Sequence, residues 1–534
     1  MKKRTPALAR GTLTRAKRLA TLGLAGLLSL GAQAQTETTV HAVMHSALRT
    51  LDPVASSATM ARNHGYMIYD MLVGIDADLN PQPQMADWTI SDDGLTYTFT
   101  LRDGLIWHDG TPVTPADCIA SLERWASFDA GGKLLMENTE SLSAIDDHSF
   151  ALTLKAPFGD VLGLLSKPSA VTAFMMPEEV ASVEPGQPLP NQIGSGPFRF
   201  IADEFQPGVQ AVYERFDGYV PRSEAPSGTA GSKEVFVDRV EWIHMPDMQT
   251  AVNAMNSGDI DYMERTPFDL LPLLDANPDI TTGVLDPLGM LTLARMNFLQ
   301  PPFDDVRIRR AAQLALGQED VLAALVGDPR YYATCASVFG CKVPLATETG
   351  GESLLSGGDP EAAKALLDDA GYDQTPVVIL QPSDVGTLTP QPLVVAQALR
   401  QAGFNVELRQ MDWQTLLGHR ANQGPVSEGG WNMTISNFAV DGIWTPTTNL
   451  LLISDGSVFG WPSDPEMEAL RDEYALALSD EERSAAAENV QARAMDQVTF
   501  IPLGQFQNVT AWRNELSDIV TGSVPAFWGM HKDT

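Results

Sequence analysis

Residues 88–125 read W-T-I-S-D-D-G-L-T-Y-T-F-T-L-R-D-G-L-I-W-H-D-G-T-P-V-T-P-A-D-C-I-A-S-L-E-R-W. In the first half of this stretch, threonines alternate with apolar side chains at Leu95, Tyr97, Phe99 and Leu101. A period of two in aromatic and β-branched residues predicts a strand that buries one face. Arg102-Asp103-Gly104 then predicts a turn.

The second half of the stretch predicts a short extended piece and a capped helix. Ile106 and Trp107 form the extended piece, and His108-Asp109-Gly110 is interpreted as turn chemistry rather than a ligand site. Thr114 followed by Pro115 is typical of a helix start. The helix carries its apolar face on Ile119, Leu122, Trp125 and Phe128.

This ordered run closely resembles the family 5 solute-binding proteins of ABC importers, the peptide, nickel and opine group. Residues 193–200, 296–311 and 360–372 carry further motifs of that family, so the resemblance spans essentially the whole mature chain. It implies an α/β fold, the two-lobed periplasmic binding protein of type II in its large three-subdomain form. The ligand cleft is expected between the lobes.

The resemblance also implies the domain order. We expect a signal peptide (1–34), a first part of lobe I (35–79), an extra subdomain of lobe I (80–191), a second part of lobe I (192–290), lobe II (291–497) and a C-terminal return to lobe I (498–534). Alternating strand and helix patterns after residue 235 favour α/β lobes on their own.

The first residues have the pattern of a secretory signal peptide. Seven basic residues precede an apolar run at 19–30, and Ala32-Gln33-Ala34 has the small residues of a cleavage site. The apolar run is too short for a comfortable membrane span. No cysteine stands at the cleavage site to carry a lipid. We therefore expect a periplasmic protein, exported by its signal peptide and not lipid-anchored.

The mature chain is strongly acidic. The leader holds 7 of the 35 basic residues, which leaves 28 against 68 acidic ones and a net charge of about −40. This balance argues against nucleic acid and anionic membranes as partners, because both attract positive charge. A solvated acidic surface explains it more simply than the steering of a cationic ligand.

The chain has three cysteines. In an oxidising compartment, Cys335 and Cys341 are the natural disulfide pair, and their short loop contributes roughly 2 kcal/mol in the chain-entropy model. Cys118 is then a small buried residue of the helix after Thr114. We expect no zinc site, because no His or Cys accompanies the pair at metal-ligand spacing.

Asp441 is the strongest candidate for a ligand contact. In the dipeptide binders of the family, an aromatic-x-x-Asp unit receives the ligand's ammonium group, and Phe438-Ala439-Val440-Asp441 matches that spacing. Trp431 and Trp444 are candidate flat walls of the site, or else core residues. In the loop that lines the cleft in the family, Ser56, Ser57 and Thr59 are candidate polar contacts, with helix capping as the alternative.

The resemblance to dipeptide binders fails at one place. Those proteins hold the ligand carboxylate with an arginine in the region that reads L-Q-P-S-D-V-G here, at 380–386, where no basic residue stands. Lys342 or Arg409 could substitute for it. The gap favours longer peptides held through their backbone, or a ligand without a carboxylate, over a plain dipeptide.

These observations predict a binding protein, not an enzyme, that captures di- or oligopeptides or peptide-like solutes and delivers them to importer permease subunits. The alternative is a non-peptide solute: an opine-like conjugate, an amine or a nickel chelate, for which His45, His64 and His419 are the candidate histidines. No hydrolase, zinc-protease or nucleotide-binding motif is present. We expect a monomer without cofactor or bound metal.

Overall fold

A computed structural model describes residues 38–533, and Thr38–Thr534 form one compact unit. The predicted signal peptide, residues 1–34, lies outside the described residues. Within the described range, no helix is both long enough and apolar enough to cross a membrane.

The stretch at 88–125 folds largely as its pattern predicts. Strand β6 (Thr96–Leu101) buries Tyr97, Phe99 and Leu101. The extended piece at Ile106 is reduced to an isolated bridge with Pro112. Helix α2 (Pro115–Phe128) begins with a capping box, in which Thr114 and Asp117 bond each other's backbone N–H groups. Local sequence signals therefore determine both the strand at the start of this stretch and the start of the helix at its end.

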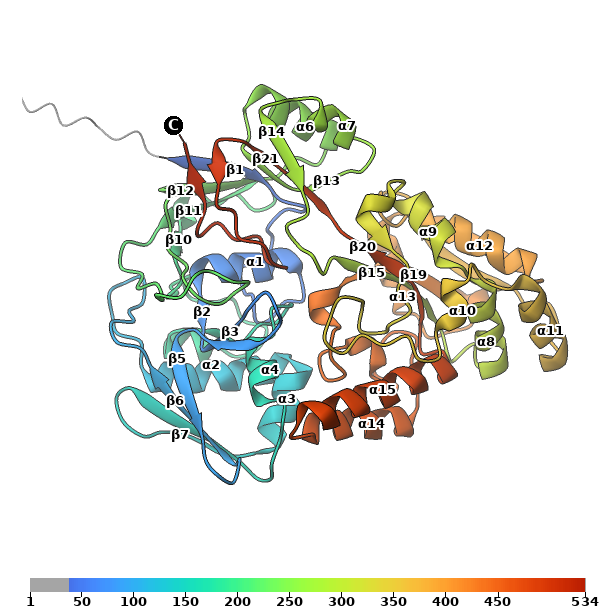
Figure 1. The fold of residues 1–534 in the computed structure, drawn as a ribbon, viewed down its shortest axis with the longest axis horizontal. Coiled ribbons are helices and arrows are strands. Elements are labelled where there is room, and N and C mark those ends of the chain that lie inside the picture. The colour runs from blue at the N-terminus through green and yellow to red at the C-terminus, as the bar shows by residue number, and fades with distance from the viewer. Residues whose placement is uncertain (1–37, 534) are drawn as a thin grey trace, which may run out of the picture. The chain divides into compact units, whose positions relative to one another are not determined.

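The stretch lies in a four-stranded antiparallel sheet of order β5-β6-β8-β7 (Figure 1). Its other strands are β5 (Ala86–Ile90), β7 (Thr139–Ala144) and β8 (Ser149–Leu154). The helices near it are α2, α3 (Ala130–Glu137), α4 (Val161–Ser166) and α5 (Glu178–Ala181). All of these elements fall inside the range expected for the extra subdomain.

A seven-stranded mixed sheet has the order β10-β11-β12-β1-β13-β21-β14. Its strands are β10 (Phe198–Phe200), β11 (Gln210–Arg215), β12 (Arg239–Ile243), β1 (Thr39–Val43), β13 (Tyr262–Thr266), β21 (Val509–Arg513) and β14 (Ile280–Gly283). Helices α1 (Thr59–Ile68), α6 (Met248–Ser257) and α7 (Leu271–Asp275) belong to the same part of the chain. Short two-stranded ladders join β2 (Asp70–Met71) to β9 (Phe174–Met175), β3 (Val73–Ile75) to β4 (Pro81–Pro83) and β22 (Leu516–Ser517) to β23 (His531–Lys532).

A six-stranded mixed sheet has the order β16-β20-β15-β19-β17-β18. Its strands are β16 (Tyr332–Ala333), β20 (Ile501–Phe506), β15 (Met290–Met296), β19 (Met433–Ala439), β17 (Val377–Pro382) and β18 (Val406–Met411). The helices of this part are α8 (Val306–Ala315), α9 (Gln318–Leu325), α10 (Glu352–Leu355), α11 (Pro360–Ala370), α12 (Gln391–Gln401), α13 (Trp413–Arg420), α14 (Pro465–Leu476) and α15 (Asp480–Gln497).

The chain crosses between the two large sheets twice, from β14 to β15 and from β20 to β21 (Figure 1). Two crossings agree with the predicted pair of lobes. The C-terminal return begins later than residue 498, however, because β20 pairs with β15 and β16 in the six-stranded sheet. The crossing is therefore at residues 507–508. The other lobe boundaries stay predictions.

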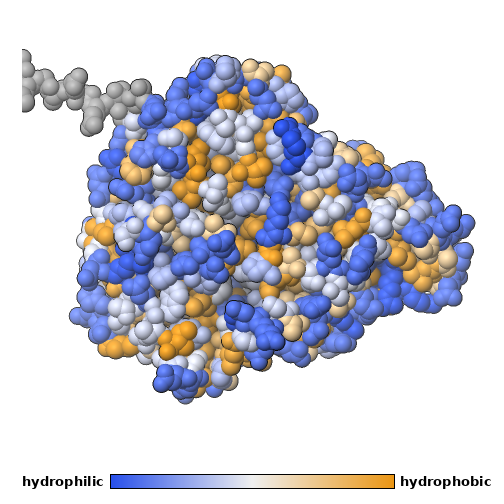
Figure 2. All heavy atoms as spheres, viewed as in Figure 1, coloured by the Kyte–Doolittle hydropathy of each residue, from blue (hydrophilic) through white to orange (hydrophobic). Residues whose placement is uncertain are grey.

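Separate hydrophobic cores support the two large sheets. One contains Trp125, Phe174 and Trp528, and the other contains Phe303, Phe404 and Phe500. Figure 2 shows hydrophilic side chains over most of the visible face, with hydrophobic groups scattered among them. Such a surface fits a solvated exterior.

A buried ion pair lies inside the first of these cores. Lys233 Nζ donates to Asp70 Oδ1 at 2.7 Å, and neither side chain is more than 1% exposed. Tyr219 Oη donates to the other carboxylate oxygen at 2.8 Å. Lys233 Nζ also lies 5.3 Å from the centre of the Trp528 ring. The charge of Lys233 is thus matched by one carboxylate and by the ring faces of Trp528 and Tyr66.

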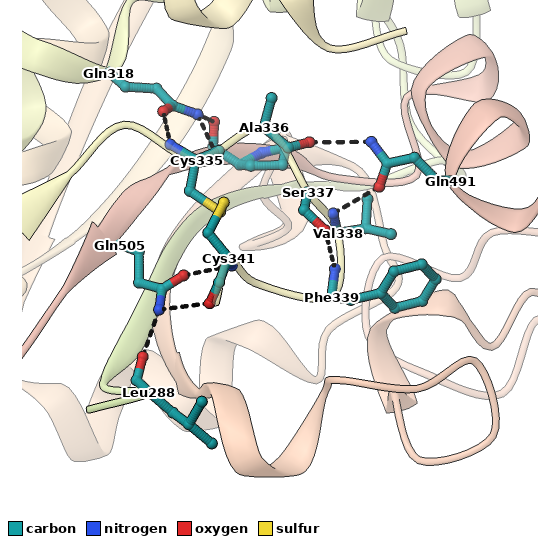
Figure 3. The surroundings of a disulfide bond; sticks show 11 residues. Leu288, Gln318, Cys335, Ala336, Ser337, Val338, Phe339, Cys341, Gln491 and Gln505 are labelled. Atoms are coloured by element: carbon teal, nitrogen blue, oxygen red, sulfur yellow. Dashed lines mark hydrogen bonds between the residues drawn. A yellow bond between two sulfur atoms is a disulfide. The ribbon is translucent and has the colours of Figure 1, made fainter. Parts of the chain in front are cut away.

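Cys335 and Cys341 form a disulfide, with Cα atoms 5.8 Å apart (Figure 3). The loop between them is held by side-chain amides: Cys335 N donates to Gln318 Oε1, and Cys341 N donates to Gln505 Oε1, each at 2.6 Å. Gly340 adopts a φ of +82°, and a Cβ there would lie 2.8 Å from Val440. The loop therefore packs directly against the residue before Asp441.

We predict that the unfolded, unreduced protein shows one reactive thiol, that of Cys118, which is buried in the native structure. Replacing Cys335 and Cys341 with serine is expected to lower the free energy of unfolding by about 2 kcal/mol, because a short loop loses its constraint. Thiol titration in denaturant and chemical unfolding measure the two effects. Three reactive thiols would contradict the pairing.

Candidate functional site

Asp441 lies at the end of strand β19, where the chain leaves the six-stranded sheet. Residues Val440–Gly442 form a single 3-10 turn, and Val440 N donates to Gly289 O at 3.0 Å. This bond fixes the turn against the crossing segment that enters β15. Asp441 is 1% exposed. The strand and the crossing together place its carboxylate between the two large sheets.

Asp441 pairs with Arg62. Arg62 lies on helix α1, in the part of the chain that contains the seven-stranded sheet. Arg62 Nη1 donates to Asp441 Oδ2 at 2.7 Å, and the side chains are 5% and 2% exposed. The remaining guanidinium N–H groups bond Asn63 Oδ1, Pro168 O and Ser523 O. Neighbours on its own side therefore hold Arg62 in place, and it presents one N–H to Asp441.

Asp286 is a second carboxylate in this region. It stands three residues before Gly289 in the first crossing segment, and its Oδ1 accepts from Leu288 N at 3.0 Å. Burial, and next the charge of Asp441, raise the pKa of Asp286 to about 6. Two carboxylates and one guanidinium leave the cluster with spare negative charge, which suits a ligand with a cationic group.

His45 and Glu264 form a further pair near Arg62. His45 Nδ1 lies 2.7 Å from Glu264 Oε2, which also accepts from His45 N. Although burial opposes it, the pKa of Glu264 falls to about 2, because His45 and Arg265 favour the carboxylate. Burial lowers the pKa of His45. Glu264 is therefore ionised at neutral pH.

The other two candidate histidines lie elsewhere. His64 is fully buried and lies within hydrogen-bond distance of Tyr213 Oη and Gln192 Oε1, at 2.9 and 3.1 Å, and burial lowers its pKa to about 4. His419 on α13 contacts Gly429 O. Across residues 38–533, no group of three or more His, Cys, Asp or Glu side chains could hold a metal ion.

The three aromatic candidates lie in different places in the structure. Phe438 is half-buried on β19, three residues before Asp441, and packs on the core of the six-stranded sheet. Trp431 precedes β19 and is fully buried with Leu380, Leu416 and Trp461, while its Nε1 donates to Arg420 O at 3.1 Å. The whole of β19 separates Trp431 from Asp441, so the structure places Trp431 in a core. Trp444 is half-buried and lines a groove beside helices α14 and α15.

The serine and threonine candidates are not helix caps. Ala58 is the N-cap residue of α1 and makes no side-chain bond. Ser56 Oγ accepts from Ala58 N at 3.1 Å, and Ser57 is exposed. Thr59 is the first residue of the helix whose fourth residue is Arg62. The capping alternative is therefore wrong for all three residues, while a ligand role stays a prediction.

The two candidate substitutes for the missing arginine differ in position. Arg409 Nη1 donates to Gly430 O, at the end of the sheet remote from Asp441. Lys342 is exposed at the end of the disulfide loop, and its Nζ can donate to the Gln507 side chain at 3.1 Å. Lys342 thus stands beside the second crossing. The cation that actually pairs with Asp441 is Arg62, which the sequence did not indicate.

Asp160 makes another contact between the extra subdomain and the six-stranded part. Thr447 Oγ1 donates to Asp160 Oδ2 at 2.5 Å. Close by, Gly159 N donates to Ala475 O at 3.0 Å, and Arg483 Nη1 lies 3.4 Å from Gly159 O. Burial raises the pKa of Asp160 to about 6, against the influence of Thr447 and Arg483.

We predict that Asp160→Asn stabilises the protein at pH 7.5 by roughly 1–3 kcal/mol, since a tenfold change in a carboxyl group's acid dissociation constant corresponds to about 1.4 kcal/mol. A raised carboxyl pKa means that stability is greatest at low pH and falls as pH rises from about 4 to 6. The variant should therefore be more stable than wild type at pH 7.5, and only slightly more stable at pH 4. Thermal unfolding at both pH values, with exposed Asp269→Asn as control, measures this; a loss at pH 7.5 would contradict it.

A groove of about 820 Å³ opens along this contact. Leu79–Pro81, the tip of the β5–β6 hairpin and residues 157–163 line one side. Pro344, Leu345, Trp444 and the α14–α15 corner line the other. The groove thus lies between the extra subdomain and the six-stranded part, whereas the Asp441–Arg62 pair joins the six-stranded part to helix α1.

Comparisons with known proteins agree with this architecture. The sequence profile of the bacterial extracellular solute-binding proteins, family 5 Middle, matches residues 80–460. The "Probable peptide ABC transporter periplasmic-binding protein" of Sinorhizobium fredii is 39% identical over 508 residues, covering 94% of this chain and 95% of the relative.

Solved structures show the same two-lobed fold. A dipeptide-binding protein of Pseudoalteromonas sp. SM9913, in complex with Met-Leu, has a TM-score of 0.77 at 17% identity, covering 93% of this chain and 100% of its own. A binding protein of A. tumefaciens R10, in complex with agropinic acid, has a TM-score of 0.76 at 21% identity, covering 93% and 99%. This chain is a two-lobed binding protein that belongs to the bacterial extracellular solute-binding proteins of family 5.

Proposed function

We propose that this protein is the periplasmic substrate-binding component of an ABC importer, which captures di- or oligopeptides or peptide-like solutes and passes them to the permease subunits. The observation that carries the proposal is the 39% identity, over 94% of the chain, to a probable peptide-binding relative. A monomer that binds without catalysis suffices for this role.

The neighbourhood of Asp441 supports a peptide-like ligand. Strand β19 leads to Asp441 through the neutral side chains of Ser436 and Asn437. Asn437 Oδ1 accepts from Gln391 Nε2, and Asn437 Nδ2 donates to Thr387 O. Neutral amide and hydroxyl groups suit the peptide backbone, while Asp441 supplies the anionic contact for an ammonium group. Phe438, Trp444, Ser56, Ser57 and Thr59 complete the proposed set. Trp431 does not belong to it, because it is core.

A second candidate is an opine-like or other non-peptide solute with an amine. Two observations favour it: no basic residue stands at 380–386, and Arg62 is already paired with Asp441. A ligand carboxylate would have to displace Asp441 from Arg62 or bind Lys342. A nickel chelate would be held differently, with His45, which contacts Glu264, as the candidate histidine.

We predict that several peptides raise the thermal unfolding midpoint of the mature protein, once co-purified ligand has been removed by unfolding and refolding. A ligand at a hundred times its dissociation constant adds about 2.7 kcal/mol. Peptides, amines, opines and nickel chelates should be compared in one screen. Stabilisation by one non-peptide alone, with all peptides silent, would reject the peptide function.

Asp441→Asn tests the proposed amine contact. The amide keeps the size of the side chain but removes its charge, so peptides with a free amino terminus should lose affinity while N-acetylated peptides change little. Isothermal calorimetry on both peptide forms measures the difference. Equal affinities of wild type and variant for the free amine would remove Asp441 from the site.

A further inference from the structure

The extra subdomain and the six-stranded part touch backbone to backbone at Gly159. Gly159 N donates to Ala475 O at 3.0 Å, at the end of helix α14. A Cβ on Gly159 would lie 1.7 Å from Ala477 O, so any side chain at this position would force the two backbones apart. The segment before α4 is therefore docked directly on the segment that ends α14.

Asp160 carries a carboxyl group into this contact, where the residue is only 7% exposed. Its Oδ2 accepts from Thr447 Oγ1, which belongs to the six-stranded part, and this is the one hydrogen bond to the carboxyl group among residues 38–533. Asp160 stands at the N-cap of α4, yet its side chain bonds no N–H of that helix. A carboxylate that exchanges water for a single hydroxyl donor is poorly compensated, so the neutral acid suits the contact better.

The charged surroundings of Asp160 do little to favour its ionised form. Arg483, on α15, directs its Nη2 at Asp480, at 2.5 Å, and its Nη1 at the carbonyls of Gly159 and Ala477, at 3.4 and 3.5 Å. The other titratable side chains around the groove that Asp160 lines are Asp92, Asp93, Tyr97, Tyr474 and Asp480. None of these five supplies a positive charge, and burial raises the pKa of both tyrosines.

Proton binding at Asp160 is therefore linked to the contact. Burial raises the pKa of Asp160 to about 6 while the contact is made, and a carboxyl group that returns to water has a pKa of about 4. The proton thus stabilises the contact fully below about pH 4, and this contribution is lost as the pH rises to about 6. Asp160 lines the groove, which gives the proton a route to solvent.

We propose that Gly159, Asp160 and Thr447 form a proton-controlled latch between the extra subdomain and the six-stranded lobe. The latch holds while Asp160 carries a proton, and it opens more readily once the carboxyl group has ionised. Acid therefore favours the joined form of these two parts, and neutral pH favours their separation. The inference rests on the two-lobed fold and not on the nature of the ligand, so its outcome is independent of the proposed peptide function.

Hydrogen exchange at the Gly159 amide measures opening of the latch, because this N–H donates across the contact. Wild type, Asp160→Asn and exposed Asp269→Asn are compared at pH 4.5 and 7.5, with each protection factor corrected for the intrinsic exchange rate. We expect the factor to fall at least about tenfold with rising pH in wild type and Asp269→Asn, and to stay constant in Asp160→Asn. The amide of Lys155, which bonds Asn138 O inside the extra subdomain, should show no such fall.

Thr447→Val is a second variant, which removes the single hydroxyl donor. It should lower the protection of the Gly159 amide more at pH 7.5 than at pH 4.5, because the carboxylate depends on that donor more than the neutral acid does. Equal protection of wild-type Gly159 at both pH values would overturn the latch, and so would a wild-type fall in Asp160→Asn. A parallel fall at Lys155 would assign the pH effect to unfolding of the extra subdomain and would also overturn the latch.

Discussion

Replacing Arg62 with methionine is expected to lower the free energy of unfolding by roughly 3–5 kcal/mol, the usual cost of removing one partner of a buried ion pair. The variant leaves Asp441, 2% exposed in its side chain, unpaired in the vicinity of Asp286. It also frees Asn63 Oδ1 and the carbonyls of Pro168 and Ser523. Chemical unfolding at pH 7.5 measures the loss, and exposed Arg49→Met is the matched control.

Two further variants separate charge from geometry at this pair. Arg62→Lys keeps the positive charge but cannot form the several hydrogen bonds of the guanidinium group. Its free energy of unfolding should therefore fall between those of wild type and Arg62→Met. The double variant Arg62→Met, Asp441→Leu removes both charges and should recover most of the stability, yet not the ligand affinity. If the free energy of unfolding of Arg62→Met lies within 1 kcal/mol of the wild-type value, the ion pair does not contribute to the stability of the folded protein.

Replacing Lys233 with alanine is expected to cost about as much, roughly 3–5 kcal/mol, because Asp70 would stay buried without its cation. Asp70 would keep the Tyr219 hydroxyl, the backbone N–H of Met71 and a long contact to Gln84. Exposed Lys133→Ala is the control, since its ion pair with Glu137 is 73% and 62% exposed.

A second variant separates charge from packing at Lys233. Lys233→Ala combined with Asp70→Asn also removes the buried carboxylate, so it should recover part of the stability lost in Lys233→Ala. Chemical unfolding of both variants measures this. Equal stability of the two would assign the loss to the Lys233 packing against Trp528 instead of to charge.

The parts of the fold that the sequence predicted correctly depend on near neighbours. The alternating strand that becomes β6 and the helix start at Thr114 are formed by residues a few positions apart. Such signals are local, so they can be read without knowing the rest of the structure.

The candidate site could be predicted only in part, because its key contact is not local. Arg62 and Asp441 are 379 residues apart in the chain, and nothing around Arg62 distinguishes it from a surface arginine of a helix. For Trp431 the sequence left two possibilities, a wall of the site or a core residue, and the structure shows a core residue. A tryptophan near a predicted ligand residue looks like a wall of the site, but an extended strand of seven residues carries it to the opposite end of the sheet.

Strand β21, close to the C-terminus, lies inside the seven-stranded sheet, between β13 and β14. Lys532 Nζ then bonds both Thr39 O, on the first strand, and Asp261. A chain that emerges amino terminus first cannot complete this sheet until almost all of it has emerged. The strands that emerge early must wait for their C-terminal partner strand, and long-range strand pairing of this kind is slow. The topology thus delays completion of this sheet until synthesis of the chain is nearly finished.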